Sequence, residues 1–374
     1  MRYPGLLLSL CLVAALPAFA AEPLRTRNVI LITLDGVRPA EFFGGLDETI
    51  AAHSAKQVYS EIDVMRERFG APTPEARRKA LMPNLWGALI PRGVAFGNRA
   101  LGSRVEVANP HRVSSPGYVE LMTGAPRAEA VDNSPKRYPY PTALEIVAAK
   151  RGLGFGQVAQ IGSWDGFALA ASSREGAFLM SGGFDALPPA QSTPSIDRLA
   201  GLRKEVLGLW EEGSDDVLSF RIALEYLKAH EPRALWIGLG NSDDWAHADR
   251  YDRLLAYLHL ADRLIGELWQ TLQSMDAYRD STTLILTTDH GRGLGPSDWA
   301  EHDVGIPGSE QAWIVVIGPD TPATGEARGG PVLELAQVAA TLLQFQGIGA
   351  DALAEGARPA LPGTLLPGRV AVAP

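Results

Sequence analysis

The chain has 374 residues, of which 46% are hydrophobic and 21% are charged, and its formal net charge at neutral pH is −9. This composition is typical of a globular protein and excludes a disordered chain, while the length allows one large domain or two. An acidic chain is a poor match for nucleic acid as a bulk partner, because that binding depends on basic side chains that neutralise phosphates. The single cysteine, Cys11, excludes a disulfide framework.

The first 21 residues have the layout of a secretory signal peptide. Arg2 precedes an apolar run over 6–16, and small residues follow over 18–21. A positive start, a short apolar run and a small-residue cleavage site are the three parts of such a signal. The run is too short to span a bilayer, and no later stretch reaches the roughly 20 apolar residues that a transmembrane helix needs. We therefore predict export to the periplasm or the medium, with no transmembrane segment.

Apolar runs alternate with amphipathic stretches along the remaining chain. We predict strands at 28–34, 234–239, 282–288 and 311–317, and helices at about 142–151, 194–211, 215–230, 248–276 and 332–345. Continuously apolar strands indicate burial on both faces of a mostly parallel sheet. The predicted fold class is α/β, with a mostly parallel central sheet sandwiched by helices. Residues 22–374 are expected to form one domain, with loop and helical insertions at about 45–110 and 165–195 that form a cap.

Carboxylates and imidazoles follow three of the predicted strands. Asp35 follows the first strand, Asp243 and His247 follow the second, Asp289 and His290 follow the third, and His302 comes soon after. Ligands of an open parallel sheet bind beyond the carboxyl ends of its strands, so these positions are the first candidates for a site. Each residue alone has an ordinary reading as a turn, a helix cap or a surface contact. Together they predict a metal centre, and the ligand mixture suits zinc, manganese or iron rather than calcium.

One further motif lies between these residues, over 113–124. It reads Val-Ser-Ser-Pro-Gly-Tyr-Val-Glu-Leu-Met-Thr-Gly, with Ser114, Pro116 and Thr123-Gly124 as its marked positions. Here the chain resembles the alkaline phosphatase superfamily, in its sulfatase and nucleotide pyrophosphatase/phosphodiesterase branches. The resemblance implies an alkaline phosphatase-like fold, Ser114 as the nucleophile and a phosphoseryl intermediate.

The resemblance also implies two divalent metal ions. One is held by Asp243, His247 and His302, and the other by Asp35, Asp289, His290 and the Ser114 oxygen. Zinc is favoured, and manganese or iron suits the same ligands. Two alternatives of register stay open, with Ser115 as the nucleophile in place of Ser114, and Asp244 as the ligand in place of Asp243.

The motif departs from the resembled family at Gly117-Tyr118. Sulfatases of this pattern carry Ser-Arg there, so a sulfatase is disfavoured, and the phosphodiesterases carry an Asn at the position of Gly117. Asn109, Arg112 or Tyr118 would have to bind the substrate anion instead. Arg112 is the best candidate, because a guanidinium makes bidentate contacts with phosphate.

We therefore predict an exported two-metal hydrolase of small phosphate esters, with Ser114 and Arg112 as catalytic residues and a phosphomonoester as the favoured substrate. The alternatives are a phosphodiesterase or nucleotide pyrophosphatase, a phosphotransferase or mutase, a sulfatase, and a metal-binding protein without catalysis. The natural substrate and the oligomeric state are left open by the sequence.

Overall fold

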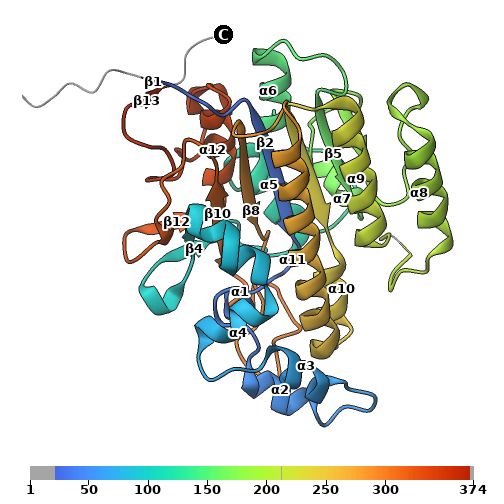
Figure 1. Ribbon diagram of the computed structural model, residues 1–374, viewed down its shortest axis with the longest axis vertical. Coiled ribbons are helices and arrows are strands. Elements are labelled where there is room, and N and C mark those ends of the chain that lie inside the picture. The colour runs from blue at the N-terminus through green and yellow to red at the C-terminus, as the bar shows by residue number, and fades with distance from the viewer. Residues whose placement is uncertain (1–21, 212, 371–374) are drawn as a thin grey trace, which may run out of the picture.

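The computed structural model describes residues 22–211 and 213–370 (Figure 1). The predicted signal peptide, 1–21, lies outside these residues. Among the described residues, no helix is long and apolar enough to cross a bilayer.

The strands are β1 (Glu22–Pro23), β2 (Asn28–Leu34), β3 (Gly93–Phe96), β4 (Arg104–Glu106), β5 (Val158–Gly162), β6 (Leu179–Ser181), β7 (Ala234–Leu239), β8 (Thr282–Thr287), β9 (Gln311–Ala312), β10 (Ile314–Ile317), β11 (Gly325–Glu326), β12 (Val332–Glu334) and β13 (Arg369–Val370). The α-helices are α1 (Pro39–Gly44), α2 (Glu48–Ser54), α3 (Ile62–Phe69), α4 (Pro74–Leu81), α5 (Ser114–Thr123), α6 (Ala143–Lys150), α7 (Asp165–Ala170), α8 (Pro194–Glu205), α9 (Asp216–His230), α10 (Asn241–His247), α11 (Tyr251–Ser274) and α12 (Gln337–Phe345).

The central sheet has eight strands in the order β11-β3-β10-β8-β2-β7-β5-β6. Strand β10 is antiparallel to both of its neighbours, and every other pair in this sheet is parallel. The prediction of an α/β fold with a mostly parallel sheet is confirmed. The three central strands β8, β2 and β7 coincide with the predicted apolar runs to within one residue.

Helices cover both faces of the sheet. Alternate side chains of β2 point to opposite faces and so enter two different hydrophobic clusters. Ile30 and Ile32 belong to one hydrophobic cluster, with residues of α9 and α11, while Val29 and Leu31 belong to a second cluster, with residues of α5, α6 and α12. Figure 1 shows the long helix α11 crossing in front of the strands. Helices on both faces explain why the strand is buried at every position.

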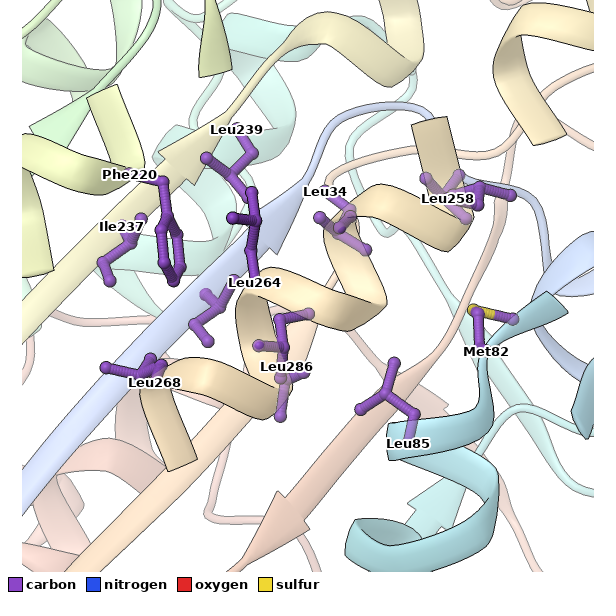
Figure 2. Close-up of a cluster of buried hydrophobic side chains, with 14 of the residues drawn as sticks. Leu34, Met82, Leu85, Phe220, Ile237, Leu239, Leu258, Leu264, Leu268 and Leu286 are labelled. Atoms are coloured by element: carbon purple, nitrogen blue, oxygen red, sulfur yellow. The ribbon is translucent and has the colours of Figure 1, made fainter. Parts of the chain in front are cut away.

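Helix α11 packs on the sheet through an apolar stripe. Its buried residues Leu254, Leu258, Ala261, Ile265 and Leu268 recur at intervals of three and four, which places them on one face of a helix. Figure 2 shows side chains of α11 above the strands that carry Leu34, Ile237 and Leu286.

Two sheet strands lie inside stretches that were predicted to be insertions. β3 lies within the 45–110 stretch but pairs with β10 and β11 of the central sheet, so the segment outside the sheet ends before Gly93. β6 lies within the 165–195 stretch and pairs with β5 at the sheet edge. These strands have four and three residues, which is too short for a recognisable hydrophobic pattern. Figure 1 shows α2–α4, which belong to the remaining insertion, gathered with the preceding α1 at the lower end of the molecule.

Two predicted helices are shorter than expected. The predicted 194–211 helix ends at Glu205, where Val206 adopts an extended conformation. The predicted 332–345 helix begins only at Gln337, because Val332–Glu334 pairs with β4 as strand β12.

A buried carboxylate at the start of α11, that of Asp252, fastens the insertion to this helix. Asp252 is 1% exposed, and its carboxylate accepts hydrogen bonds from the Arg250 guanidinium at 2.9 and 2.7 Å and from the Glu61 N–H at 3.0 Å. Burial by itself opposes ionisation of Asp252, but these donors outweigh it and hold the pKa of this carboxyl below its ordinary value. A group of this kind stabilises the fold above its unfolded-state pKa of about 4 and loses that contribution as pH falls through its folded pKa.

We therefore expect Asp252→Asn to lower the free energy of unfolding by about 1–3 kcal/mol at pH 7, the usual range for hydrogen bonds to a charged group. The gap from wild type should narrow in acid below about pH 4, where wild-type Asp252 itself becomes protonated. Urea denaturation of both proteins at pH 7 and below about pH 4 measures this difference in the free energy of unfolding. Asp276→Asn, at an exposed pair with Arg279, is the control and should change stability by less than about 0.5 kcal/mol. An equal gap for Asp252→Asn at both pH values would contradict the assignment.

Candidate active site

Three adjacent parallel strands end at one edge of the sheet. β2 lies between β7 and β8 and runs parallel to both. Asp35 directly follows β2, Asp289 and His290 follow β8, and α10, with Asp243 and His247, begins just after β7. Because carboxyl ends of parallel strands meet at one edge, these distant segments converge there. The connection from β8 back to the antiparallel β10 stays at this edge and brings His302 to it.

Asp35, Asp289 and His290 form the first of two clusters of potential metal ligands. His290 Nε2 lies 3.4 Å from Asp35 Oδ1 and 3.4 Å from Asp289 Oδ2. Ser114 Oγ is a fourth potential ligand, 3.4 Å from His290 Nε2 and 3.5 Å from Asp35 Oδ1. All four residues are buried.

Asp243, His247 and His302 form the second cluster. His247 Nε2 lies 3.2 Å from Asp243 Oδ2 and 3.0 Å from His302 Nε2, which in turn lies 3.8 Å from Asp243 Oδ1. The two clusters adjoin, because His290 Nε2 is 3.9 Å from Asp243 Oδ1 and the rings of His290 and His302 stack with their centroids 3.9 Å apart. Ligand atoms of Asp243, His290 and His302 also lie within 4.8 Å of one another, and His247 is the most exposed of the three site histidines.

The donor atoms of the first cluster fit a divalent cation. Asp289 Oδ1 accepts the Gly36 N–H at 3.0 Å, whereas Oδ2 is buried without a hydrogen-bond partner in the described part of the chain. His290 Nδ1 lies 2.9 Å from the Gly291 carbonyl oxygen and donates to it, which directs Nε2 at the carboxylates. A buried carboxylate oxygen without a partner is costly, so a cation there satisfies a definite need.

The same cluster favours positive charge in other ways. Burial, followed by the charge of Asp35, raises the pKa of Asp289 to about 7. Burial opposes protonation of His290, but Asp289 and Asp35 outweigh it and raise the pKa of His290 to about 9. A proton on Nε2 of His290 therefore competes with a cation for this position.

The histidines of the second cluster are held in the neutral form. Burial, followed by the charge of His290, lowers the pKa of both His302 and His247. His302 Nδ1 donates to the Arg112 carbonyl oxygen at 3.1 Å, which leaves Nε2 with its lone pair toward Asp243 and His247. Neutral imidazole is the form that ligates metals, so the second cluster also fits a cation.

Ser114 is the first residue of α5. Val113 precedes it in an extended conformation and makes no side-chain cap, and the helix ends at Gly124 with a left-handed φ of 77°. The Ser115 N–H donates to Asn133 Oδ1 and Pro116 has no N–H, so the attraction of this helix start for an anion comes from the helix dipole. An anionic group that reached Ser114 Oγ would therefore also meet the positive end of α5.

The structure distinguishes Ser114 from Ser115 and Asp243 from Asp244 by what each residue contacts. Ser114 Oγ faces Asp35 and His290, whereas the backbone N–H of Ser115 donates to Asn133 Oδ1 at 2.9 Å. Asp243 lies among the histidines, whereas Asp244 Oδ2 accepts a hydrogen bond from Asn241 at 2.8 Å. The geometry thus brings Ser114 and Asp243, rather than their neighbours, to the ligand clusters.

Gly117 has a packing role that the sequence does not reveal. A Cβ atom at this position would lie 2.6 Å from the Asp289 carbonyl oxygen. The first turn of α5 therefore packs directly on the end of β8, and a side chain at 117 would push the helix away from the first cluster.

The candidates for anion binding have other partners. The Arg112 guanidinium lies 3.5 Å from Glu310 Oε2, and Arg112 has a left-handed φ of 54°. Asn109 is buried, with its side-chain NH₂ donating to Glu120 and its oxygen accepting the N–H groups of His111 and Arg112. The contact that ties Arg112 to the clusters is the one from its carbonyl oxygen to His302.

A cavity of about 150 Å³ opens beside the first cluster. Its lining includes Asp35, Ser114 and Asp243 together with Asn133, Trp164 and Trp210. Its size suits a small group such as a phosphate or a sulfate, held next to Ser114.

No protein-family model and no curated protein sequence matches this chain. Solved structures do resemble it. A protein in the alkaline phosphatase superfamily from Vibrio parahaemolyticus has 13% identity and a TM-score of 0.50, covering 90% of this chain and 72% of its own. The chain has the alkaline phosphatase fold.

A putative sulfatase and a phosphonate monoester hydrolase also have this fold. A putative sulfatase from Bacteroides thetaiotaomicron has 12% identity and a TM-score of 0.57, covering 90% of this chain and 74% of its own. The phosphonate monoester hydrolase of Agrobacterium radiobacter has 14% identity and a TM-score of 0.53, covering 89% of this chain and 78% of its own. The resemblance found in the sequence is thus confirmed for the fold.

Arg292 is a residue of this candidate site that the sequence analysis missed. It is 1% exposed, and its guanidinium contacts the Asp243 carboxylate and donates to the carbonyl oxygens of Gly36 and Ala300. Burial lowers its pKa to about 10. Arg292 joins the turn after β2 and the start of α10 to the loop before His302. Its position two residues after His290 was the only available signal.

Other supporting residues also lie close in sequence to the predicted ones. Tyr118 is fully buried, and its OH donates to Asp35 Oδ2 at 3.0 Å, while Ser242 Oγ donates to the Asp35 carbonyl oxygen at 2.7 Å. Asp216 is more distant in sequence, and its carboxylate accepts the N–H groups of Gly240 and Asn241 at 3.0 and 2.8 Å. These contacts orient Asp35 and the start of α10.

The two adjacent aspartates give a matched pair of variants. Asp243→Asn should lower the content of the second cation and kcat/KM by 10²-fold or more, on the order seen when groups that support a metal are lost. Asp244→Asn should lower the metal content less than about tenfold, because its carboxylate bonds to Asn241 rather than to the histidines. Metal analysis of the two purified variants measures the difference. Greater metal loss in Asp244→Asn would reverse the register.

Proposed function

We propose that the protein is an exported, metal-dependent hydrolase of small phosphate esters, with monoesters as its preferred substrates. One observation carries the proposal, namely the position of Ser114 Oγ, within 3.5 Å of both Asp35 Oδ1 and His290 Nε2 at the start of α5 and on the wall of a cavity. A hydroxyl that faces a cluster of buried carboxylates and imidazoles is a candidate nucleophile. Export is proposed from the signal-like segment at 1–21 alone.

Ser114 is proposed to act as the nucleophile. Its Oγ attacks phosphorus, the Oγ–P bond forms while the bond from phosphorus to the alcohol oxygen breaks, and the hydroxyl proton leaves toward Asp35, to which Ser114 donates. The departing alcohol oxygen takes a proton from water, and the proton held by Asp35 then neutralises the hydroxide that is left, which restores the Asp35 carboxylate. Water then cleaves the Oγ–P bond, which releases phosphate and returns a proton to Ser114.

The proposed metal positions are supported by the two ligand clusters. Asp35, Asp289, His290 and Ser114 would hold one cation, and Asp243, His247 and His302 would hold the other. Bound divalent cations stabilise a serine alkoxide and the charge that develops on a transferred phosphoryl group. The remaining work falls to the chain itself, with Tyr118 and Arg292 orienting carboxylates of the two clusters. Zinc is our preferred identity for both ions, since three histidines are among the ligands.

The preference for monoesters rests on the size of the cavity beside Ser114. At about 150 Å³ it suits one small anionic group. Among the described residues, the lining of this cavity holds no Arg or Lys, so the cationic side chain that contacts the substrate has to come from outside it. Arg112 remains our proposed anion contact, which requires its guanidinium to leave Glu310 when substrate binds.

Sulfate ester hydrolysis is the second candidate. It is favoured by the fold shared with a putative sulfatase. Gly117-Tyr118 disfavours it, because Gly117 is packed against Asp289 and Tyr118 is committed to Asp35, so neither position offers the arginine of the resembled sulfatases.

Turnover of three chromogenic esters tests the proposal. The purified, metal-loaded protein should hydrolyse p-nitrophenyl phosphate faster than bis-p-nitrophenyl phosphate, and both faster than p-nitrophenyl sulfate. Faster cleavage of the sulfate would replace the proposal by a sulfatase, and an added alcohol that captures the phosphoryl group would indicate a transferase. No turnover of any ester by protein with both metals bound would contradict an enzymatic function.

A further inference from the structure

A second, larger cavity adjoins the one beside Ser114. Its volume is about 340 Å³, and it lies between α9, α10 and α11 and the connection from α8 to α9. Asn241 and Asp244 line both cavities, so the two spaces share a wall. The larger one contains none of the proposed metal ligands.

The lining of this second cavity is mainly apolar. Val217, Trp245, Ala256, Tyr257 and Leu260 contribute from the three helices, and Leu207 and Leu209 from the connection. A pocket of 300–1,000 Å³ with apolar walls and a few polar groups is typical of small-molecule sites.

The connection between α8 and α9, of which residues 206–211 and 213–215 are described, is here termed the strap. It borders both cavities, since Leu207 and Leu209 face the larger one while Trp210 and Gly213 face the one beside Ser114. Leu207 is 97% exposed and Trp210 is 53% exposed. Exposed apolar side chains concentrated around a cavity indicate a surface that binds another apolar group.

The structure therefore points to a substrate with two unlike parts. We propose that the physiological ester carries an apolar alcohol portion, an alkyl chain or an aromatic group, which lies in the larger cavity while the anionic group lies beside Ser114. This inference rests on the proposed hydrolase function and adds the substrate class. A cavity of 150 Å³ with apolar walls holds benzene, so about 340 Å³ accommodates a group of roughly twice that size.

Chain-length dependence tests the proposal in the metal-loaded enzyme. From ethyl to octyl phosphate, kcat/KM should rise about two- to fourfold per methylene until the cavity is filled, which is the factor expected for burying each CH₂. Ala256→Phe, which fills the cavity from α11, should lower the octyl-to-ethyl ratio of kcat/KM at least about tenfold. Ala100→Phe, in a separate exposed cavity lined by Arg78 and Glu326, is the matched control and should preserve the ratio.

Binding of uncleavable analogues separates this inference from the proposed hydrolysis. Octylphosphonic acid should bind at least about tenfold more tightly than methylphosphonic acid by calorimetry, or octanesulfonic acid more tightly than methanesulfonic acid if the site prefers sulfate esters. Ala256→Phe should abolish the difference. Selective octyl binding without any ester turnover would support the apolar subsite and contradict the hydrolase.

Two results would overturn the inference. One is equal affinity for the methyl and octyl compounds of both series, whatever the hydrolytic activity. The other is a dimer, detected by sedimentation, that Ala256→Phe dissociates with no change in chain-length dependence, which would mean that a second copy of the chain covers the cavity.

Discussion

Ser114→Ala is expected to lower kcat/KM for p-nitrophenyl phosphate by at least about 10³-fold, since loss of a nucleophile can cost on the order of 10⁶-fold in kcat. The metals should stay, because the Ser114 hydroxyl is only one of four potential ligands in its cluster. Steady-state kinetics together with metal analysis of the same preparation measures both effects. Loss of chemistry with retention of metal is the signature of a nucleophile rather than of a structural serine.

Ser115→Ala is the matched control for this variant. Its backbone N–H bonds to Asn133 whatever side chain the residue carries, so kcat/KM should change less than about tenfold. Mass spectrometry of acid-quenched turnover should find phosphate on Ser114 in the wild-type enzyme. Phosphate on Ser115, or full activity of Ser114→Ala, would show that the assigned nucleophile is wrong.

Asp289→Asn is expected to remove the cation of the first cluster and to lower kcat/KM by 10²-fold or more. The carboxylate is fully buried, and its Oδ2 has no hydrogen-bond partner among the described residues, so an amide there puts an NH₂ or a neutral oxygen where a ligand charge is needed. Metal analysis and kinetics measure the loss. Excess metal should restore only part of the activity.

The same variant should have the opposite effect on stability once metal is removed. Burial and the Asp35 charge both oppose ionisation of Asp289 and raise its pKa to about 7. A carboxyl of this kind destabilises the fold as pH rises through its folded pKa. Metal-free Asp289→Asn should therefore unfold at higher denaturant than metal-free wild type at pH 8, and the order should reverse when metal is bound.

Asp320→Asn is the control, because Asp320 is equally buried but accepts hydrogen bonds from Thr26 and Arg25 far from the ligand clusters. It should lower stability in both states and leave the metal content unchanged. Equal metal loss in the two variants would mean that Asp289 acts through the fold rather than as a ligand.

The central strands could be predicted from the sequence because each one is decided locally. β2 and β7 are apolar at most positions, β8 has a Leu-Ile-Leu run between threonines, and α9 and α11 repeat apolar residues at helical intervals. The edge strands could not be predicted, because β3 and β6 are short and acquire strand conformation from the neighbours with which they pair. The reversed direction of β10 also has no local signal, since an apolar run reads the same either way.

The candidate site divides in a similar way. Asp35, Asp289 and His290 were found because polar residues directly after buried strands stand out in the sequence. Arg292 and Asp216 were missed, because an arginine in a loop and an aspartate at a helix start look ordinary until their buried partners are known. Gly117 was read as a missing side chain, whereas the close approach of α5 to Asp289 leaves no room for one.

The sequence by itself thus determined the fold class, the buried strands and the residue types at their ends, because hydrophobic pattern and strand-end position are properties of short segments. Only the tertiary structure decided which histidine meets which carboxylate, which serine faces them, and how the strap places apolar side chains beside Asn241 and Asp244. Those relations join segments that are more than 100 residues apart in some cases, such as Ser114 and His290. They are set by strand order and helix packing, which no local pattern encodes.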